Sequence, residues 1–219
     1  MARTGYFHGD LRRALLDAGL DAAREGGPEA VSLRELARGT GVAPSAVYRH
    51  FESHERLVSA LALRSLAMVA DAMEDEIARV PTGDGSAEAQ RAWADGAIAA
   101  VGLAYVRFAW AEPGLFRLAF RAHRDLDAAH HDGARGACGR TPYEQLERAL
   151  DALAESGEIT AEQRAGAEAL AWSAVHGFAT LTVEGPLRSL AEPVRDALSR
   201  RIVEMVRLGL SATPEVGAP

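Results

Sequence analysis

The sequence contains a single cysteine and no apolar segment long enough to cross a membrane. Cys138 alone can form neither an internal disulfide nor a Cys-x-x-Cys metal or redox motif. The longest apolar run, AIAAVGLAY from Ala97, is less than half of the about 20 residues that a membrane-spanning helix needs. The opening stretch, MARTGYFHGDLRR, lacks the apolar core of a secretory signal peptide. We therefore expect a soluble protein of the cytoplasm with no membrane partner.

Positive charge is also scarce, because 24 basic residues, all of them arginine, stand against 31 acidic residues. The net charge of −7 excludes a protein that coats nucleic acid by bulk electrostatics. The excess is unevenly spread, since residues 1–52 hold seven arginines and seven acidic residues, and the rest of the chain carries all of it. The first segment is therefore the part of the chain whose charge least opposes an anionic partner.

Strand signals are nearly absent, while apolar residues recur at helical spacing along almost the whole chain. The sequence therefore predicts an all-α protein of about nine helices. Four are expected in the first part of the chain, over residues 10–25, 32–39, 44–51 and 53–79. Five more are expected over residues 87–112, 113–121, 142–155, 161–183 and 192–208.

Short polar signals mark several helix ends. Asp10 and Ser53 are candidate N-caps, and Pro44 suits a first helical turn because it has no N–H to lose. The SLRE motif predicts a capping box, in which Ser32 and Glu35 satisfy each other's backbone N–H groups. The second helix is short, because GTGV interrupts it before Pro44.

Residues 122–141 lack a sustained apolar stripe and are predicted to form a mobile connection, and the tail ATPEVGAP is predicted to be disordered. The connection gathers four side chains of metal-binding type, whose spacing fits no usual zinc pattern. They are His123, His130, His131 and Cys138. The sequence leaves open whether they bind a metal. A solvated loop is the favoured interpretation, and no cofactor is expected.

The segment TGVAPSAVYRHF, residues 40–51, joins two short helical patterns that follow a longer helix. This arrangement is typical of a helix-turn-helix, whose second helix enters the DNA major groove. An ordinary helical corner with a solvated face is the alternative. Val47 and Phe51 are expected inside, which leaves small and then aromatic or basic side chains outside, suited to base edges and phosphate oxygens. The expected DNA contacts on this face are Ser32, Arg34, Pro44, Ser45, Ala46, Tyr48, Arg49 and His50.

The stretch LRELARGTGVAPSAVYRHFESHERLV resembles the N-terminal domain of the TetR family of bacterial transcription regulators. The resemblance rests on the spacing of Ser32, Ala37, Gly41, Val42, Tyr48, His50, Phe51 and Leu57. It implies a three-helix DNA-binding domain over residues 1–52 and a ligand-binding and dimerisation domain over residues 53–219. The family commonly has a lysine just after the aromatic residue, and this sequence departs from the family there with His54. His54 is still counted among the expected DNA contacts.

Two further blocks, YVRFAWAEPGLFRLAF from Tyr105 and AWSAVHGFATL from Ala171, resemble the TetR subfamily whose effector domain is named for a Trp-His-Gly pattern. Trp172, His176 and Gly177 are the matching residues. Ser173 and His176 share a helical face, but no acid partner or nucleophile elbow accompanies them. No enzymatic activity is therefore expected.

The predicted helix over residues 87–112 alternates large and small side chains, which indicates either close helix packing or room for a ligand. With the aromatic residues that follow, it predicts an apolar ligand pocket in which a lone histidine is the polar contact. The alternative is that the histidine bonds a neighbouring helix and the small residues only permit close packing. The expected ligand contacts are Trp93, Ala97, Ala100, Ala104, Phe108, Phe116, Phe120, Trp172 and His176.

The last two long helices carry apolar stripes that a monomer would struggle to cover, so they are the predicted dimer interface. Its expected residues are Leu170, Ala174, Leu181, Val194, Leu198, Ile202 and Met205. The sequence thus predicts a ligand-responsive repressor that binds a palindromic operator as a homodimer and that a small apolar effector releases. The alternative is a helical small-molecule-binding or scaffolding protein that does not act on DNA.

Overall fold

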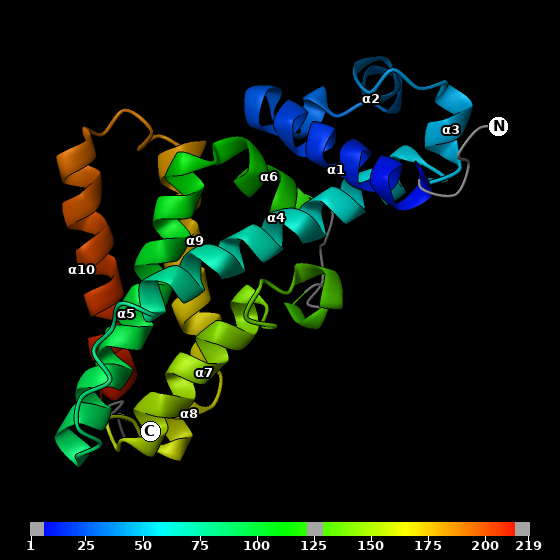
Figure 1. Ribbon diagram of the computed structural model, residues 1–219. Helices are drawn as coiled ribbons and strands as arrows, with labels where there is room; N and C mark the ends of the chain where they lie inside the picture. Colours follow the sequence, from blue (N-terminus) through cyan, green and yellow to red (C-terminus); the bar gives the residue numbers. More distant parts are fainter. Residues whose placement is uncertain (1–6, 122–128, 213–219) are drawn as a thin grey trace, which may run out of the picture.

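The structure is a computed structural model that describes residues 7–121 and 129–212 (Figure 1). In these ranges the chain is helical and has no strand, which confirms the predicted all-α class. The first helices are α1 (Phe7–Gly26), α2 (Leu33–Gly39), α3 (Pro44–Tyr48) and α4 (His54–Ile77). The others are α5 (Ala87–Ala111), α6 (Pro113–Arg121), α7 (Pro142–Glu155), α8 (Ala161–Arg164), α9 (Ala167–Val183) and α10 (Glu192–Ser211). Two short 3₁₀ turns, η1 (Pro28–Ala30) and η3 (Asp132–Ala134), lie between them.

The helix α4 joins the two parts of the molecule. In Figure 1 it runs from the small group formed by α1, α2 and α3 into the larger bundle formed by α5 to α10. It packs on α1 at its start and on α5, α6 and α7 further along. Leu57 and Leu61 have no exposed surface and belong to the same apolar core as residues of the larger bundle. The two parts therefore share one continuous core, with α4 running through it.

The small group is closed by the apolar positions that the helix-turn-helix pattern predicts to lie inside. Val47 and Phe51 are buried as predicted, and Leu33 and Leu36 of α2 are buried with them. The Arg12 guanidinium lies 5.3 Å from the centre of the Phe51 ring and covers it from α1. α3 is held by this contact surface, because a helix of one and a half turns cannot be stable by itself.

The predicted capping box at the start of α2 is wrong. Ser32 occupies the N-cap position in extended conformation, but its side chain makes no capping hydrogen bond. The Glu35 carboxylate instead accepts two hydrogen bonds from the Arg38 guanidinium one turn later. At α4 the prediction is confirmed, since the Ser53 hydroxyl accepts from the Arg56 N–H at 3.2 Å.

The helix predicted over residues 161–183 is two helices. Ala165 is extended and Gly166 has φ 76°, a left-handed conformation that ends α8 and starts α9 in a new direction. Thr160 and Gln163 form a capping box that lets the four-residue α8 exist as a separate turn. The described residues therefore form ten α-helices, where the sequence predicts about nine.

The described part of the predicted mobile connection is packed on α4. Ala134 in η3 has no exposed surface, and the Ala137 N–H donates to the Asp71 carboxylate at 2.7 Å. Small residues make this possible, because a side chain at Gly136 would meet the Asp71 carboxylate at 2.5 Å. The sequence missed this packing because it depends on backbone contacts and on no apolar stripe. Residues 122–128 and 213–219 lie outside the described ranges.

The four candidate metal ligands are not brought together in the described structure. His131 Nδ1 accepts from the Gly133 N–H at 2.9 Å, and His130 Nδ1 lies 3.7 Å from a Glu144 oxygen. Cys138 Sγ lies 3.8 Å from the Gln145 amide nitrogen, and His123 is outside the described residues. Within residues 7–121 and 129–212, no group of three histidine, cysteine or acidic side chains could hold a metal ion. No helix in these ranges is both long and apolar enough to span a bilayer.

Candidate nucleic-acid interface and ligand cavity

The outer face of α2 and α3 presents most of the predicted DNA contacts to solvent. On α3, Pro44, Ser45 and Tyr48 are exposed, and 54% of the Tyr48 surface is accessible. Arg34 on α2 is exposed too, and Arg49 directly after α3 is exposed. The remaining three residues predicted on this face, Ser32, Ala46 and His50, are half-buried. Small side chains and basic or aromatic side chains of the predicted set are therefore both accessible to solvent on this motif.

His54 has a contact inside the motif. Its Nε2 lies 2.9 Å from the Val31 carbonyl oxygen, so Nε2 carries the hydrogen and donates it. This bond ties the first turn of α4 to the segment that leads into α2. The structure thus shows His54 in a hydrogen bond within the motif. Its contact with DNA stays a prediction.

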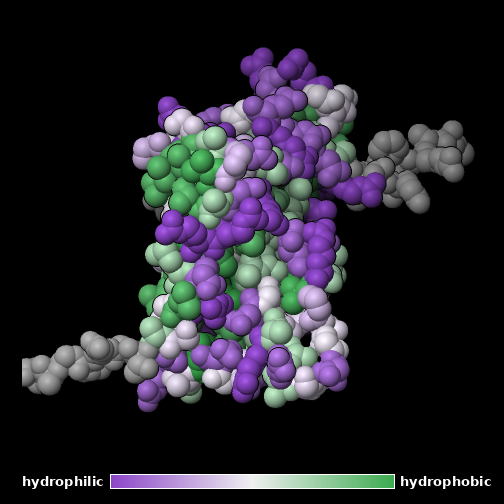
Figure 2. Space-filling view, turned by 90° about the vertical axis from the view of Figure 1, so that its left-hand side faces the viewer, coloured by the Kyte–Doolittle hydropathy of each residue, from purple (hydrophilic) through white to green (hydrophobic). Residues whose placement is uncertain are grey.

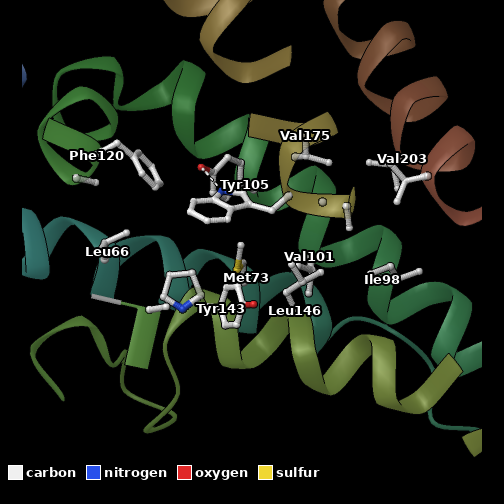
Figure 3. A pocket seen from close by; sticks show the side chains of 17 residues that line it. Leu66, Met73, Ile98, Val101, Tyr105, Phe120, Tyr143, Leu146, Val175 and Val203 are labelled. Atoms are coloured by element: carbon white, nitrogen blue, oxygen red, sulfur yellow. Dashed lines mark hydrogen bonds between the residues drawn. The ribbon is translucent and has the colours of Figure 1, made fainter. Parts of the chain in front are cut away.

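The larger bundle forms a partly open cavity of about 100 Å³ (Figure 3). Its wall is formed by 17 residues, of which 16 lie in α4, α5, α6, α7, α9 and α10 and one is Ala129. Leu66 and Met73 come from α4, and Val203 comes from α10 on the opposite side. Among residues 7–121 and 129–212, no charged side chain lines the cavity. It is an apolar chamber with few polar groups, as binding sites for small molecules commonly are.

The predicted ligand contacts are mostly outside this cavity. Phe120 and Trp172 line it. The other seven do not: Trp93, Ala97, Ala100, Ala104, Phe108, Phe116 and His176. The residues of α5 that line the cavity are Ile98, Val101, Gly102 and Tyr105, a stripe rotated by about one residue, or 100°, from the predicted one.

The predicted stripe differs from the observed one because the small residues on α5 allow close packing against neighbouring helices. Ala97, Ala100 and Ala104 are buried, and Phe108 and Phe116 are buried with them in the core. Trp93 lies away from the cavity, with the Arg148 guanidinium 5.2 Å from its ring centre. For the alanine stripe, the alternative of close packing is therefore the correct one.

His176 bonds a neighbouring helix. Its Nδ1 lies 2.7 Å from the Tyr105 hydroxyl, and its ring packs against Phe116, Phe120 and Trp172. The Trp172 Nε1–H also points to the Tyr105 oxygen, at the long distance of 3.4 Å. Tyr105 is a polar lining residue that the sequence analysis missed, although it is the single tyrosine within an apolar run.

The protonation of this cluster follows from burial. Burial raises the pKa of Tyr105 far above its ordinary value, and burial lowers the pKa of His176, so both groups are neutral at pH 7. The Tyr105 oxygen accepts from Trp172, and its hydrogen therefore goes to His176 Nδ1. His176 then carries its own hydrogen on Nε2.

The predicted dimer residues leave an apolar face uncovered on α9 and α10. Leu170 and Met205 are 65% and 67% exposed, and Leu181 and Val194 are also exposed. Figure 2 looks at the side of the molecule on which α10 lies and shows hydrophobic surface there, set among hydrophilic side chains. Three of the predicted residues are half-buried: Ala174, Leu198 and Ile202. Leu198 and Ile202 pack partly on the core of their own chain.

Two family profiles match the chain. The profile described as "Bacterial regulatory proteins, tetR family" matches residues 15–61, which contain α2, α3 and most of α1. The profile described as "Tetracyclin repressor-like, C-terminal domain" matches residues 98–206, which contain most of the cavity wall. The first match covers the candidate nucleic-acid interface, and the second covers the candidate ligand cavity.

Solved structures share the fold over almost the whole chain, whereas no curated protein matches the sequence. A protein of unknown function from Rhodococcus sp. RHA1 is 24% identical with a TM-score of 0.70, covering 96% of this chain and 100% of that one. A TetR variant from Acinetobacter baumannii AYE in complex with minocycline is 17% identical with a TM-score of 0.58, covering 91% and 97%. A TetR family transcription regulator from Marinobacter aquaeolei VT8 is 20% identical with a TM-score of 0.56, covering 90% and 95%.

The solved structures establish the helical architecture, and the two profiles assign both parts of the molecule to one family. The chain belongs to the TetR family of bacterial transcription regulators.

Proposed function

We propose that the protein is a repressor that binds a palindromic operator as a homodimer and leaves it when a small apolar ligand fills the cavity. Regulators of this family are ligand-responsive and act on transcription, which indicates a regulator and no enzyme. The observation that carries the proposal is the exposed face of α2 and α3, with Arg34, Tyr48 and Arg49 at its surface. α4 connects this face to the cavity wall through Leu66 and Met73.

The proposed contacts follow the chemistry of the exposed face. Ser32, Tyr48 and His50 are assigned to phosphate oxygens, and Arg34, Ser45 and Ala46 to base edges. Small side chains at the start of α3 support this division, because they let the helix approach a groove closely. Pro44, Arg49 and His54 complete the proposed set around these six residues.

The homodimer is proposed from the recognition mode and from the uncovered face of α9 and α10. A palindrome presents two half-sites about 34–36 Å apart, and a two-fold axis between two copies matches that symmetry. A ligand that favours a different spacing of the two α3 helices would then weaken binding to DNA. The minocycline complex of the Acinetobacter protein supports a small-molecule role for the cavity by analogy of fold alone.

Binding to the DNA upstream of the gene, measured by fluorescence anisotropy against a random duplex of equal length, tests the proposal. The replacement Tyr48→Phe should weaken binding to both duplexes alike, because a lost phosphate contact carries no sequence information. If only the specific complex weakens, Tyr48 reads bases and its assignment is wrong. If the protein binds neither duplex, the helical ligand-binding or scaffolding protein becomes the better description.

A further inference from the structure

The size and the polar groups of the cavity carry an inference about its ligand, which rests on the proposed function. A cavity of about 150 Å³ lined by aliphatic and aromatic side chains holds benzene in another protein. The cavity described here has about 100 Å³. Because it is smaller than that cavity, it holds at most one ring, and a substituent on the ring has to extend to the half-buried Tyr143. A fused polycyclic or long-chain ligand needs a change in the protein.

The deep polar groups of the cavity are already satisfied. The Tyr105 hydroxyl donates to His176 and accepts from Trp172, so the one buried hydroxyl on the α5 side has used its hydrogen within the protein. A ligand that competed for this hydrogen would leave His176 Nδ1 without a partner in an apolar surrounding, which is costly. The hydrogen bond to a ligand must therefore come from another group.

Tyr143 is that group. It lines the cavity from α7, its ring lies 6.3 Å from that of Trp172, and its hydroxyl makes no hydrogen bond to the residues that the structure describes. Burial first, and then the charges of Glu168 and Glu147, raise the pKa of Tyr143. The hydroxyl is therefore protonated at neutral pH, and it offers a ligand one donor and one acceptor.

The charges beyond Tyr143 disfavour an anion. Glu147 follows Tyr143 by one turn of α7, and Glu168 precedes Trp172 by one turn of α9. Arg164 provides no partner for an anionic ligand, because it is paired with Asp151 and Glu168. A cation gains little from this end of the cavity, because the same arginine offsets Glu168 and because burying an uncompensated charge costs more than a cation–π contact returns.

We infer that the cavity binds a small, uncharged, single-ring aromatic molecule that carries one hydroxyl, with Tyr143 as its hydrogen-bond partner. The ring lies among Phe120, Tyr143 and Trp172, and the hydroxyl faces α7. Carboxylates of the same shape are excluded by desolvation and by the nearby acidic side chains. The side chains of the cavity wall thus select uncharged ligands over charged ones. This selectivity can be measured without measuring DNA binding.

Four probes of one shape test this inference on the full chain at neutral pH: toluene, p-cresol, p-toluate and p-methylbenzylammonium. Isothermal titration calorimetry should give a Kd for p-cresol at least about 30-fold below that of either charged probe. The variant Tyr143→Phe should raise the Kd of p-cresol by about 3- to 10-fold, and it should leave that of toluene within about 2-fold. The variant Ala171→Leu, which fills the cavity, should weaken both neutral probes.

Three results would overturn the inference: equal or tighter binding of a charged probe, no binding of either neutral probe at millimolar concentration, or an equal loss of p-cresol and toluene in Tyr143→Phe. If Ala171→Leu fails to fold, the Kd values of p-cresol and toluene for Tyr143→Phe still test the inference. The proposed function has a separate readout, because p-cresol could bind as inferred and leave operator affinity unchanged. That outcome would remove the cavity as the effector site and keep its selectivity.

Discussion

His176 is held by one short hydrogen bond to Tyr105, and this bond joins α9 to α5. Tyr105 and His176 come from α5 and α9 and are joined at 2.7 Å inside an aromatic cluster. Tyr105 is buried, and His176 is half-buried beside it. The pair is therefore a structural link in the wall behind Trp172.

Removing the imidazole should lower the stability of the ligand-free protein. In His176→Ala the Tyr105 hydroxyl loses its acceptor, and a buried unsatisfied donor costs about 1–3 kcal/mol of unfolding free energy. Adding Tyr105→Phe should cost less than the sum of the two single changes, because the unsatisfied donor is gone. Urea unfolding of the four proteins measures this, and simple additivity would contradict the link.

The same histidine should make stability depend on pH in a defined direction. Burial lowers the pKa of His176 below that of the unfolded chain, so the unfolded state binds more protons in the interval between the two values. The stability from the neutral imidazole is complete above about pH 7 and is lost as pH falls through the folded pKa. Thermal melting at about pH 7.5 and pH 5.5 should therefore show a smaller decrease for His176→Gln than for the wild type. Equal decreases would show that His176 has the same pKa in the folded and in the unfolded chain.

At the scale of elements, α6 sits against the end of α1 at backbone distance. An added side-chain carbon at Gly114 would lie 1.9 Å from the Ala23 carbonyl oxygen, so α6 can approach only because this residue is glycine. Two ion pairs cross the same contact, Arg24 with Glu112 at 3.1 Å and Arg121 with Glu29. Because α6 also contributes Ala119 and Phe120 to the cavity, it touches both the cavity and the DNA-binding group.

The variant Gly114→Ala should separate α6 from α1. The clash is with backbone and cannot be relieved by a rotamer change, so we expect a loss of about 1–3 kcal/mol of unfolding free energy. The matched control is Gly209→Ala in α10, where an added carbon meets nothing within 4 Å. This control should be neutral or stabilising by up to about 1 kcal/mol, because alanine is the better helix former. A Gly114 variant as stable as the control would mean that the α1–α6 contact is not close in solution.

Sequence reasoning predicted the elements well where one face is apolar and poorly where packing depends on backbone. The helix-turn-helix core was predictable because Leu33, Leu36 and Val47 repeat on one face. The segment from Ala129 to Thr141 was not, because it is held by a hydrogen bond from the Ala137 N–H to Asp71 and by close contact at Gly136. The cavity-facing side of α5 lies one residue away from the predicted stripe, because the alanines of that stripe pack against neighbouring helices.

At the scale of the whole molecule, the exposed apolar residues of α9 and α10 indicate where a second copy would pack. Leu170 and Met205 are the best test positions, because each has about two thirds of its surface exposed. Leu198, the more obvious choice from the sequence, also packs on the core of its own chain. A charge at Leu198 would therefore confound dimerisation with folding.

The variant Met205→Glu should give monomers in sedimentation velocity and lose operator binding, while its helical content and melting behaviour stay near those of the wild type. The reason is that an unpaired carboxylate would be buried only in the dimer. Arg200→Glu, on an exposed position of the same helix outside the predicted apolar stripe, serves as the charge control. A dimeric Met205→Glu would move the interface away from the last two helices.

Because α4 is long and uninterrupted, a small tilt of the helix at the cavity moves its other end, at the DNA-binding group, by a larger distance. From Met73 at the cavity to His54 at the DNA-binding group the helix spans 19 residues, or about 28 Å at 1.5 Å per residue. A tilt of about 5° at the cavity end would carry the other end through about 2.5 Å by simple leverage over that helix length. Successive bases along one DNA strand are separated by about 3.4 Å, so the displacement approaches one base step. In the proposed homodimer, a displacement of this size caused by a ligand in the cavity of about 100 Å³ would move the two α3 helices out of register with the two half-sites of a palindromic operator.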